Sequence, residues 1–217
     1  MRTILFPLVT VILFGFLTFA QASEIADHQN WDGIGVSKQV NPKFELALDK
    51  EIRYKSGFHF KNFDKVTIAL NYDVTRWFEM GLQYWRGQIR SGAEWRKEQK
   101  PVLVVKFTYN FPRCELSARH KLEYRIIQKY DNIPVYKFRT QVKYPVNNHK
   151  LISETYINNE MFVNLKENGF YLNRIRAGVK LNSGFLSPDI NYVFQLSNKN
   201  DEWTTVHAFA VKVWMEF

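Results

Sequence analysis

Charged side chains recur at every second position in several stretches of the sequence, and they have the clearest potential for chemistry. In the stretch "ELSARHKLEYRI", Arg119, Lys121, Glu123 and Arg125 alternate with apolar residues. Successive side chains of a β-strand point to opposite faces, so this spacing places the charges on one face. The charged face that we predict comprises Glu45, Asp49, Glu51, Arg53, Arg119, Lys121, Glu123, Arg125, Lys137, Arg139, Arg174, Arg176 and Lys180, with further acids at Glu79, Glu154, Glu160 and Asp189.

These charged rows allow two kinds of chemistry if they line an enclosed interior. Opposite charges can pair with one another and with water, which gives an ion-pair network that fills a narrow lumen. The cations are concentrated in residues 114–128, 134–144 and 169–182. Rings of charge tune selectivity in pores, so a pathway or pocket for a small anion is the alternative.

Hydrolytic or acyl-transfer chemistry would need a serine or a water activated by a base. His120 and His207 fall on the apolar face of their segments, and Ser117 and Ser153 are the nearby hydroxyl groups. His120 and Ser117 point to opposite faces, and no G-x-S-x-G motif is present. The single cysteine and the absence of a His/Asp pair at ligand spacing argue against a metal site. We therefore predict no catalytic residues, no metal and no cofactor.

Long segments of alternating polarity must position these residues. Ten can be drawn, at residues 43–55, 64–73, 76–89, 101–110, 114–128, 134–144, 150–163, 169–182, 187–197 and 205–217. Strands in soluble sheets cluster near five or six residues, whereas a tilted membrane strand needs about nine to eleven. The sequence predicts an all-β protein, a single antiparallel up-and-down transmembrane β-barrel of about ten strands, with twelve as the alternative.

A soluble all-β protein is the competing interpretation. A soluble barrel of ten strands would have to enclose roughly fifty large apolar side chains, although a barrel of about eight strands is already filled by its own. A two-sheet sandwich would leave long edges that need protection. An apolar face turned to lipid and a charged face turned to the lumen avoid both problems.

The connections predict an orientation. Short ones such as "DVT" and "NFPR" alternate with long ones such as "SGFHFKNF" and "RSGAEWRKEQK", as expected for short periplasmic turns and longer external loops. Ten strands would place both termini in the periplasm. The segment from Asn30 to Val40 breaks that parity, and the sequence does not decide between a lead-in, a segment in the lumen and a further strand.

The two ends of the chain carry export signals. Met1 to Ala22 has a basic start, an apolar core and an A-x-A exit, which predicts a cleaved secretory signal at 1–22 and an outer-membrane barrel domain at 23–217. The final segment resembles the terminal strand that outer-membrane proteins present to the barrel-assembly machinery. Its apolar face carries Phe209, Val211, Val213, Met215 and Phe217.

Most of the chain resembles the domain-of-unknown-function 2490 family of small exported bacterial proteins. The matching elements are an early tryptophan, "FELALDKEIRY", "HKLEYR", "NNEMFVN", "NRIRAGVKL" and "DINYVFQL", in that order. The resemblance implies a small bacterial outer-membrane β-barrel, and it carries no catalytic residues to transfer.

The predicted function is therefore a structural or interaction role in the bacterial outer membrane, with a narrow charged lumen and no catalysis. A small anion-permissive channel is the first alternative, and an outer-membrane lipid-modifying enzyme, a hydrolase or acyltransferase, is the second. The net charge of +9 would also suit nucleic acid, but export argues against that partner. The expected partners are outer-membrane lipid and the barrel-assembly machinery, and the sequence points to no small-molecule substrate.

Overall fold

The protein is a closed β-barrel, seen in a computed structural model that describes residues 26–55, 59–146, 149–167, 169–182, 184–199 and 202–217. The predicted secretory signal at residues 1–22 lies outside the described residues. The strands run as β1 (Ala26–Asn41), β2 (Phe44–Lys55), β3 (Phe60–Asp73), β4 (Phe78–Ser91), β5 (Glu94–Asn110), β6 (Glu115–Ile127), β7 (Ile133–Pro145), β8 (Ile152–Asn164), β9 (Gly169–Leu181), β10 (Leu186–Lys199) and β11 (Glu202–Glu216).

Eleven strands close the barrel, so the strand number lies between the predicted ten and the alternative of twelve. Ten strands correspond to the ten segments drawn from the sequence. The eleventh is β1, which contains the segment from Asn30 to Val40 and pairs with β2 on one side and β11 on the other.

The barrel is not purely antiparallel, because β1 and β11 pair in parallel, with Ile34 opposite Val213. Each connection reverses the chain direction, so the eleventh strand must run the same way as the first. All other neighbouring strands pair antiparallel.

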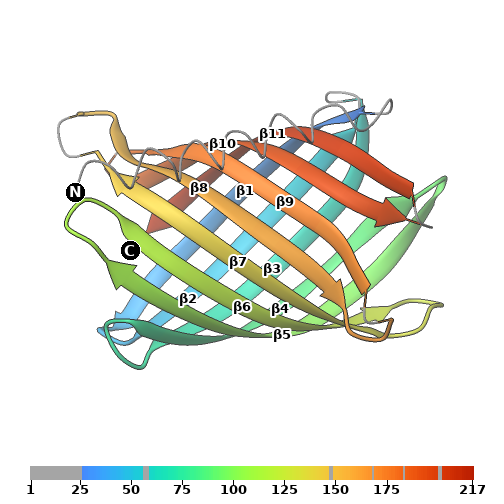
Figure 1. Cartoon of the computed structure of the whole chain (residues 1–217), viewed down its shortest axis with the longest axis horizontal. Coiled ribbons are helices and arrows are strands. Elements are labelled where there is room, and N and C mark those ends of the chain that lie inside the picture. Colours follow the sequence, from blue (N-terminus) through green and yellow to red (C-terminus); the bar gives the residue numbers. More distant parts are fainter. Residues whose placement is uncertain (1–25, 56–58, 147–148, 168, 183, 200–201) are drawn as a thin grey trace.

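The odd strand count also corrects the expected position of the termini. Ala26 and Phe217 lie at opposite ends of the barrel (Figure 1), which we call the Ala26 end and the Phe217 end. The last residue joins the wall at the β1–β2 turn, where Phe217 N donates to Ser37 O at 3.0 Å and Gln39 N donates to Phe217 O at 3.1 Å.

The connections do not alternate between short and long as the sequence suggested. Strand β4 continues to Ser91 and β5 begins at Glu94, so most of "RSGAEWRKEQK" belongs to strands, and Gly92 makes the turn with a φ of 64°. A glycine suits this position because L side chains rarely adopt a positive φ. Loop length therefore does not indicate which end of the barrel would face the periplasm.

The strands are long enough to cross a bilayer. The shortest, β2, has 12 residues. At about 3.3 Å per residue and a tilt of about 40°, it extends about 30 Å along the barrel axis, more than the apolar band of about 25 Å on outer-membrane barrels. None of the described residues forms a helix long and apolar enough to cross a membrane.

The two faces of the wall differ in polarity. Large apolar side chains project outward, among them Leu82, which is 61% exposed, and Ile68 and Phe209, which are each 52% exposed. The intervening residues face the interior, where Val104 is 2% exposed. Side chains from different strands project into the interior and meet there.

Small residues at the β1–β11 seam make room for two tryptophans inside. Trp31 is buried with Val193, Ala208 and Ala210. A Cβ at Gly35 would lie 2.5 Å from the ring of Trp214. Glycine at this position therefore lets the Trp214 ring lie flat against β1.

Candidate functional site

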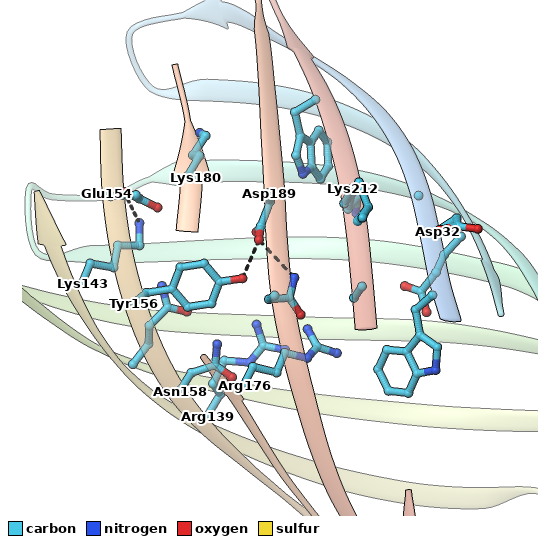
Figure 2. A pocket seen from close by; sticks show the side chains of 18 residues that line it. Asp32, Arg139, Lys143, Glu154, Tyr156, Asn158, Arg176, Lys180, Asp189 and Lys212 are labelled. Carbon is cyan, nitrogen blue, oxygen red and sulfur yellow. Dashed lines mark hydrogen bonds and ion pairs between the residues drawn. The ribbon is translucent and has the colours of Figure 1, made fainter. Parts of the chain in front are cut away.

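The candidate site is the charged interior, which contains two adjoining cavities. The larger has a volume of about 630 Å³ and is lined by residues of all eleven strands. The smaller, of about 260 Å³, is lined by residues of β1, β2 and β7 to β11 and is drawn in Figure 2. Glu51, Arg139, Arg176, Lys212 and Trp214 line both cavities and form the boundary between them.

Glu160 of β8 is the acidic centre of the network. Its Oε1 lies 2.8 Å from Arg139 Nη2 and 3.1 Å from Arg119 Nη2. Its Oε2 lies 3.5 Å from Arg174 Nη1. Three guanidinium groups from β6, β7 and β9 therefore meet one carboxylate that is 4% exposed.

A second cluster lies on β5 to β7. Glu123 accepts from Lys137 Nζ at 2.6 Å and lies 3.9 Å from Lys100 Nζ. Glu98 accepts from Arg125 Nε at 2.5 Å and lies 3.5 Å from Lys100 Nζ. Lys100 thus links the two buried carboxylates.

Arginines also stack around Trp31 of β1. The guanidinium carbon of Arg53 lies 3.7 Å from the centre of the Trp31 ring, and those of Arg174 and Arg176 lie at 5.0 and 5.6 Å. Arg53 also pairs with Glu51 at 2.6 Å. Cation–π contacts and ion pairs together narrow the lumen at this level.

Hydrogen bonds and ion pairs connect the side chains that line the smaller cavity (Figure 2). Tyr156 of β8 donates to Asp189 Oδ1 of β10 at 2.6 Å, and Asn191 Nδ2 donates to the same oxygen at 3.0 Å. At the Phe217 end, Lys143 lies 3.9 Å from Glu154 Oε2, and Lys180 lies 2.9 Å from Glu216.

The predicted charged face lies inside the barrel, where its other acidic residues also have polar partners. Glu45 accepts from Asn71 at 3.2 Å, and Asp49 lies 3.3 Å from Lys212 Nζ and 3.9 Å from Lys65 Nζ. Lys65 also pairs with Glu51 at 3.1 Å. Arg176 and Lys121 line the larger cavity without an ion pair to any described carboxylate.

Sequence reasoning missed several members of the network, including Trp31, Lys65, Glu98, Lys100 and Lys212. Glu98 and Lys100 were assigned to an external loop, and Trp31 to a segment of undecided structure. Lys212 faces inward at an alternate position of the final segment, a signal that was present in the sequence.

The hydroxyl and imidazole groups considered for catalysis are not brought together. His120 Nδ1 bonds Tyr136 Oη at 2.6 Å, and His207 Nδ1 bonds Tyr192 Oη. Ser117 is buried on the inner face, and Ser153 Oγ donates to Lys180 O at 3.0 Å. Among the described residues, no group of three or more His, Cys, Asp or Glu side chains is placed to hold a metal.

The residues of the final segment predicted to face lipid lie on the outer face of β11. Phe209 is 52% exposed and Phe217 is 68% exposed. Val211, Val213 and Met215 alternate with the inward Lys212 and Trp214.

A closed all-β barrel with an apolar outer wall and an ion-paired interior is the class of protein that this geometry defines. The chain belongs to the DUF2490 family, described as a protein of unknown function, whose model matches residues 28–206. This match confirms the resemblance noted in the sequence.

The fold is similar to that of a solved structure. LpxR from Salmonella typhimurium superimposes with a TM-score of 0.51 over 79% of this chain and 83% of that chain, at 8% sequence identity. Such a low identity shows a similar fold alone. No curated protein matches the sequence.

Proposed function

We propose that the protein is an integral barrel of the bacterial outer membrane, with a structural or interaction role and a narrow charged lumen. The observation that carries this proposal is the opposite polarity of the two faces of one wall. Side chains such as Leu82 and Phe209 are exposed on the outside, while Glu160 and Arg174 are enclosed. Lipid hydrocarbon would cover the first group, and mutual pairing with enclosed water stabilises the second.

Membrane fractionation tests this proposal. A barrel held in the outer membrane should need detergent for extraction and should migrate faster on a gel when unboiled, because the closed sheet resists the detergent until heated. Release of the full chain into the soluble periplasm would overturn the proposal.

Anion passage is the second candidate, favoured by the charge of the larger cavity. Eleven cationic residues line it and only five acidic ones, Glu45, Asp49, Glu51, Glu123 and Glu160. A low-dielectric cavity with one excess sign of charge concentrates counter-ions. Planar-bilayer recordings decide between the candidates, because stepwise anion-selective currents would support a channel and a silent bilayer would support a closed barrel.

A lipid-modifying enzyme remains the alternative from a different class. His120 and His207 each bond a tyrosine, and neither bonds a serine. Lipid analysis of a deletion strain tests this alternative, since an altered lipid A or phospholipid profile would favour an enzyme.

A further inference from the structure

Cations face cations across the β6–β7 pair. Arg119 lies directly opposite Arg139, and Lys121 lies directly opposite Lys137, with all four side chains inside the barrel. Like charges directly opposite one another destabilise a sheet. Such an arrangement needs negative charge close by.

The carboxylates of the chain supply only part of that charge. Six cations share three acids. Glu98 pairs with Lys100 and Arg125, and Glu123 pairs with Lys100 and Lys137. Glu160 pairs with Arg119, Arg139 and Arg174. Lys121 is a seventh cation in the same region. Among the described residues no carboxylate oxygen lies within 4.0 Å of its Nζ, which donates to the neutral Gln83 Oε1 at 2.8 Å.

Two unused donors belong to residues that line the same cavity. The Nε atoms of Arg119 and Arg176 are buried and have no hydrogen-bond partner in the protein. Both residues line the larger cavity with Lys121. A buried donor without a partner is unfavourable, and more so on a charged group, so an acceptor that reaches either Nε atom would be stabilised.

We propose that the larger cavity binds a multivalent oxyanion, a phosphate group, between Arg119 and Lys121 of β6. These residues are two positions apart on one strand, so their Cβ atoms are about 7 Å apart and both side chains can reach one phosphate. Arginine and lysine form strong charge-assisted hydrogen bonds to phosphate. The volume of about 630 Å³ admits a phosphate monoester as well as inorganic phosphate.

This site goes beyond the proposed membrane role, and it does not require the lumen to conduct. Calorimetry on the full-length protein in uncharged detergent at low salt tests it, with inorganic phosphate and glycerol 3-phosphate as separate probes. We expect saturable one-to-one binding of phosphate that weakens as sodium chloride is added. Tighter binding of the monoester would assign the site to an esterified phosphate, and equal or weaker binding would assign it to the free anion.

Two variants and a control locate the site. Lys121→Gln removes the unpaired cation and should weaken phosphate binding at least tenfold. Gln83→Glu keeps every cation but gives Lys121 a carboxylate partner, so it should weaken binding by a similar factor while the barrel keeps its heat-modifiable migration. Lys143→Gln is the matched control, because Lys143 already has Glu115 at 3.4 Å and lines only the smaller cavity.

The control should bind phosphate as tightly as the parent protein. Absence of saturable binding to either probe by the parent protein would overturn the proposal. Undiminished binding by both Lys121→Gln and Gln83→Glu would also overturn it.

Discussion

Glu160 connects three strands through a single carboxylate. Arg119, Arg139 and Arg174 all reach it within 3.5 Å, and their guanidinium groups would otherwise repel one another in a partly desolvated space. Removing one partner of a buried ion pair is costly because it leaves an uncompensated charge.

We therefore expect Glu160→Gln to lower the free energy of unfolding by about 3 kcal/mol, the low end for a broken buried pair, because a cavity adjoins the site. Urea unfolding in lipid vesicles, followed by tryptophan fluorescence, measures the change. Glu154→Gln is the control, since Glu154 is more exposed and its ion pair with Lys143 is long, at 3.9 Å. Losing this ion pair should lower the free energy of unfolding by less than about 1 kcal/mol. Equal effects of the two substitutions would contradict the central role of Glu160.

An exposed ion pair between two loops offers a pH prediction. Lys166 Nζ donates to Asp131 Oδ2 at 2.6 Å, and this hydrogen bond lowers the pKa of the Asp131 carboxyl and raises the pKa of Lys166. The Asp131 contribution is present above its unfolded pKa and is lost as pH falls through the lowered value. The Lys166 contribution is lost as pH rises through the raised value. Between pH 5 and 8 we therefore expect Asp131→Asn to have no pH-dependent effect on the thermal transition; a slope in that window would contradict this assignment.

The sequence predicted at residue scale which side chains are charged and on which face of a strand they lie. It could not predict their partners. Arg119 and Glu160 are 41 positions apart and lie on β6 and β8, two strands that do not pair. Their contact depends on the curvature of the closed wall, which local alternation does not encode.

Strand β1 is the element that departs most from the pattern of the others. Its outward positions His28, Asn30 and Asp32 are polar, and its inward positions include Gly33 and Gly35. The alternation of apolar and charged residues is therefore weak. Parallel pairing could not be read from the sequence either, because it follows from the strand count.

The close approach of β1 to Trp214 gives a prediction for this element. A Cβ at Gly35 would meet three ring atoms of Trp214 at 2.5 to 2.9 Å, whereas one at Gly33 would meet mainly the flexible Lys212 side chain, at 3.0 Å. Overpacking typically costs 1–3 kcal/mol, so Gly35→Ala should destabilise the barrel by about 2 kcal/mol, and Gly33→Ala by less than half of that.

Urea unfolding of the two variants checks this difference. Adding Trp214→Leu to Gly35→Ala should recover much of the lost stability, because the clash is with the indole ring. Equal stability of Gly35→Ala and Gly33→Ala would contradict the parallel seam.

At the scale of the whole molecule, a wall that is apolar outside and charged inside fits the lipid surroundings that we propose. Which side chains face inward and which face outward was predictable, because apolar and polar residues alternate with a period of two in ten segments. The strand number was not, because one weakly patterned strand changes the parity and moves the two termini to opposite ends.

Site-by-site labelling of β11 tests the orientation of this wall most directly. Single cysteines replace residues 208 to 215 in a Cys114→Ser background, and each variant in lipid vesicles meets a lipid-soluble and a water-soluble maleimide. We predict that Phe209, Val211, Val213 and Met215 positions react with the lipid-soluble reagent alone, while Ala208, Ala210, Lys212 and Trp214 positions do not. Reversed alternation, or no alternation along the strand, would contradict a barrel that turns its apolar face to lipid and its charges to the lumen.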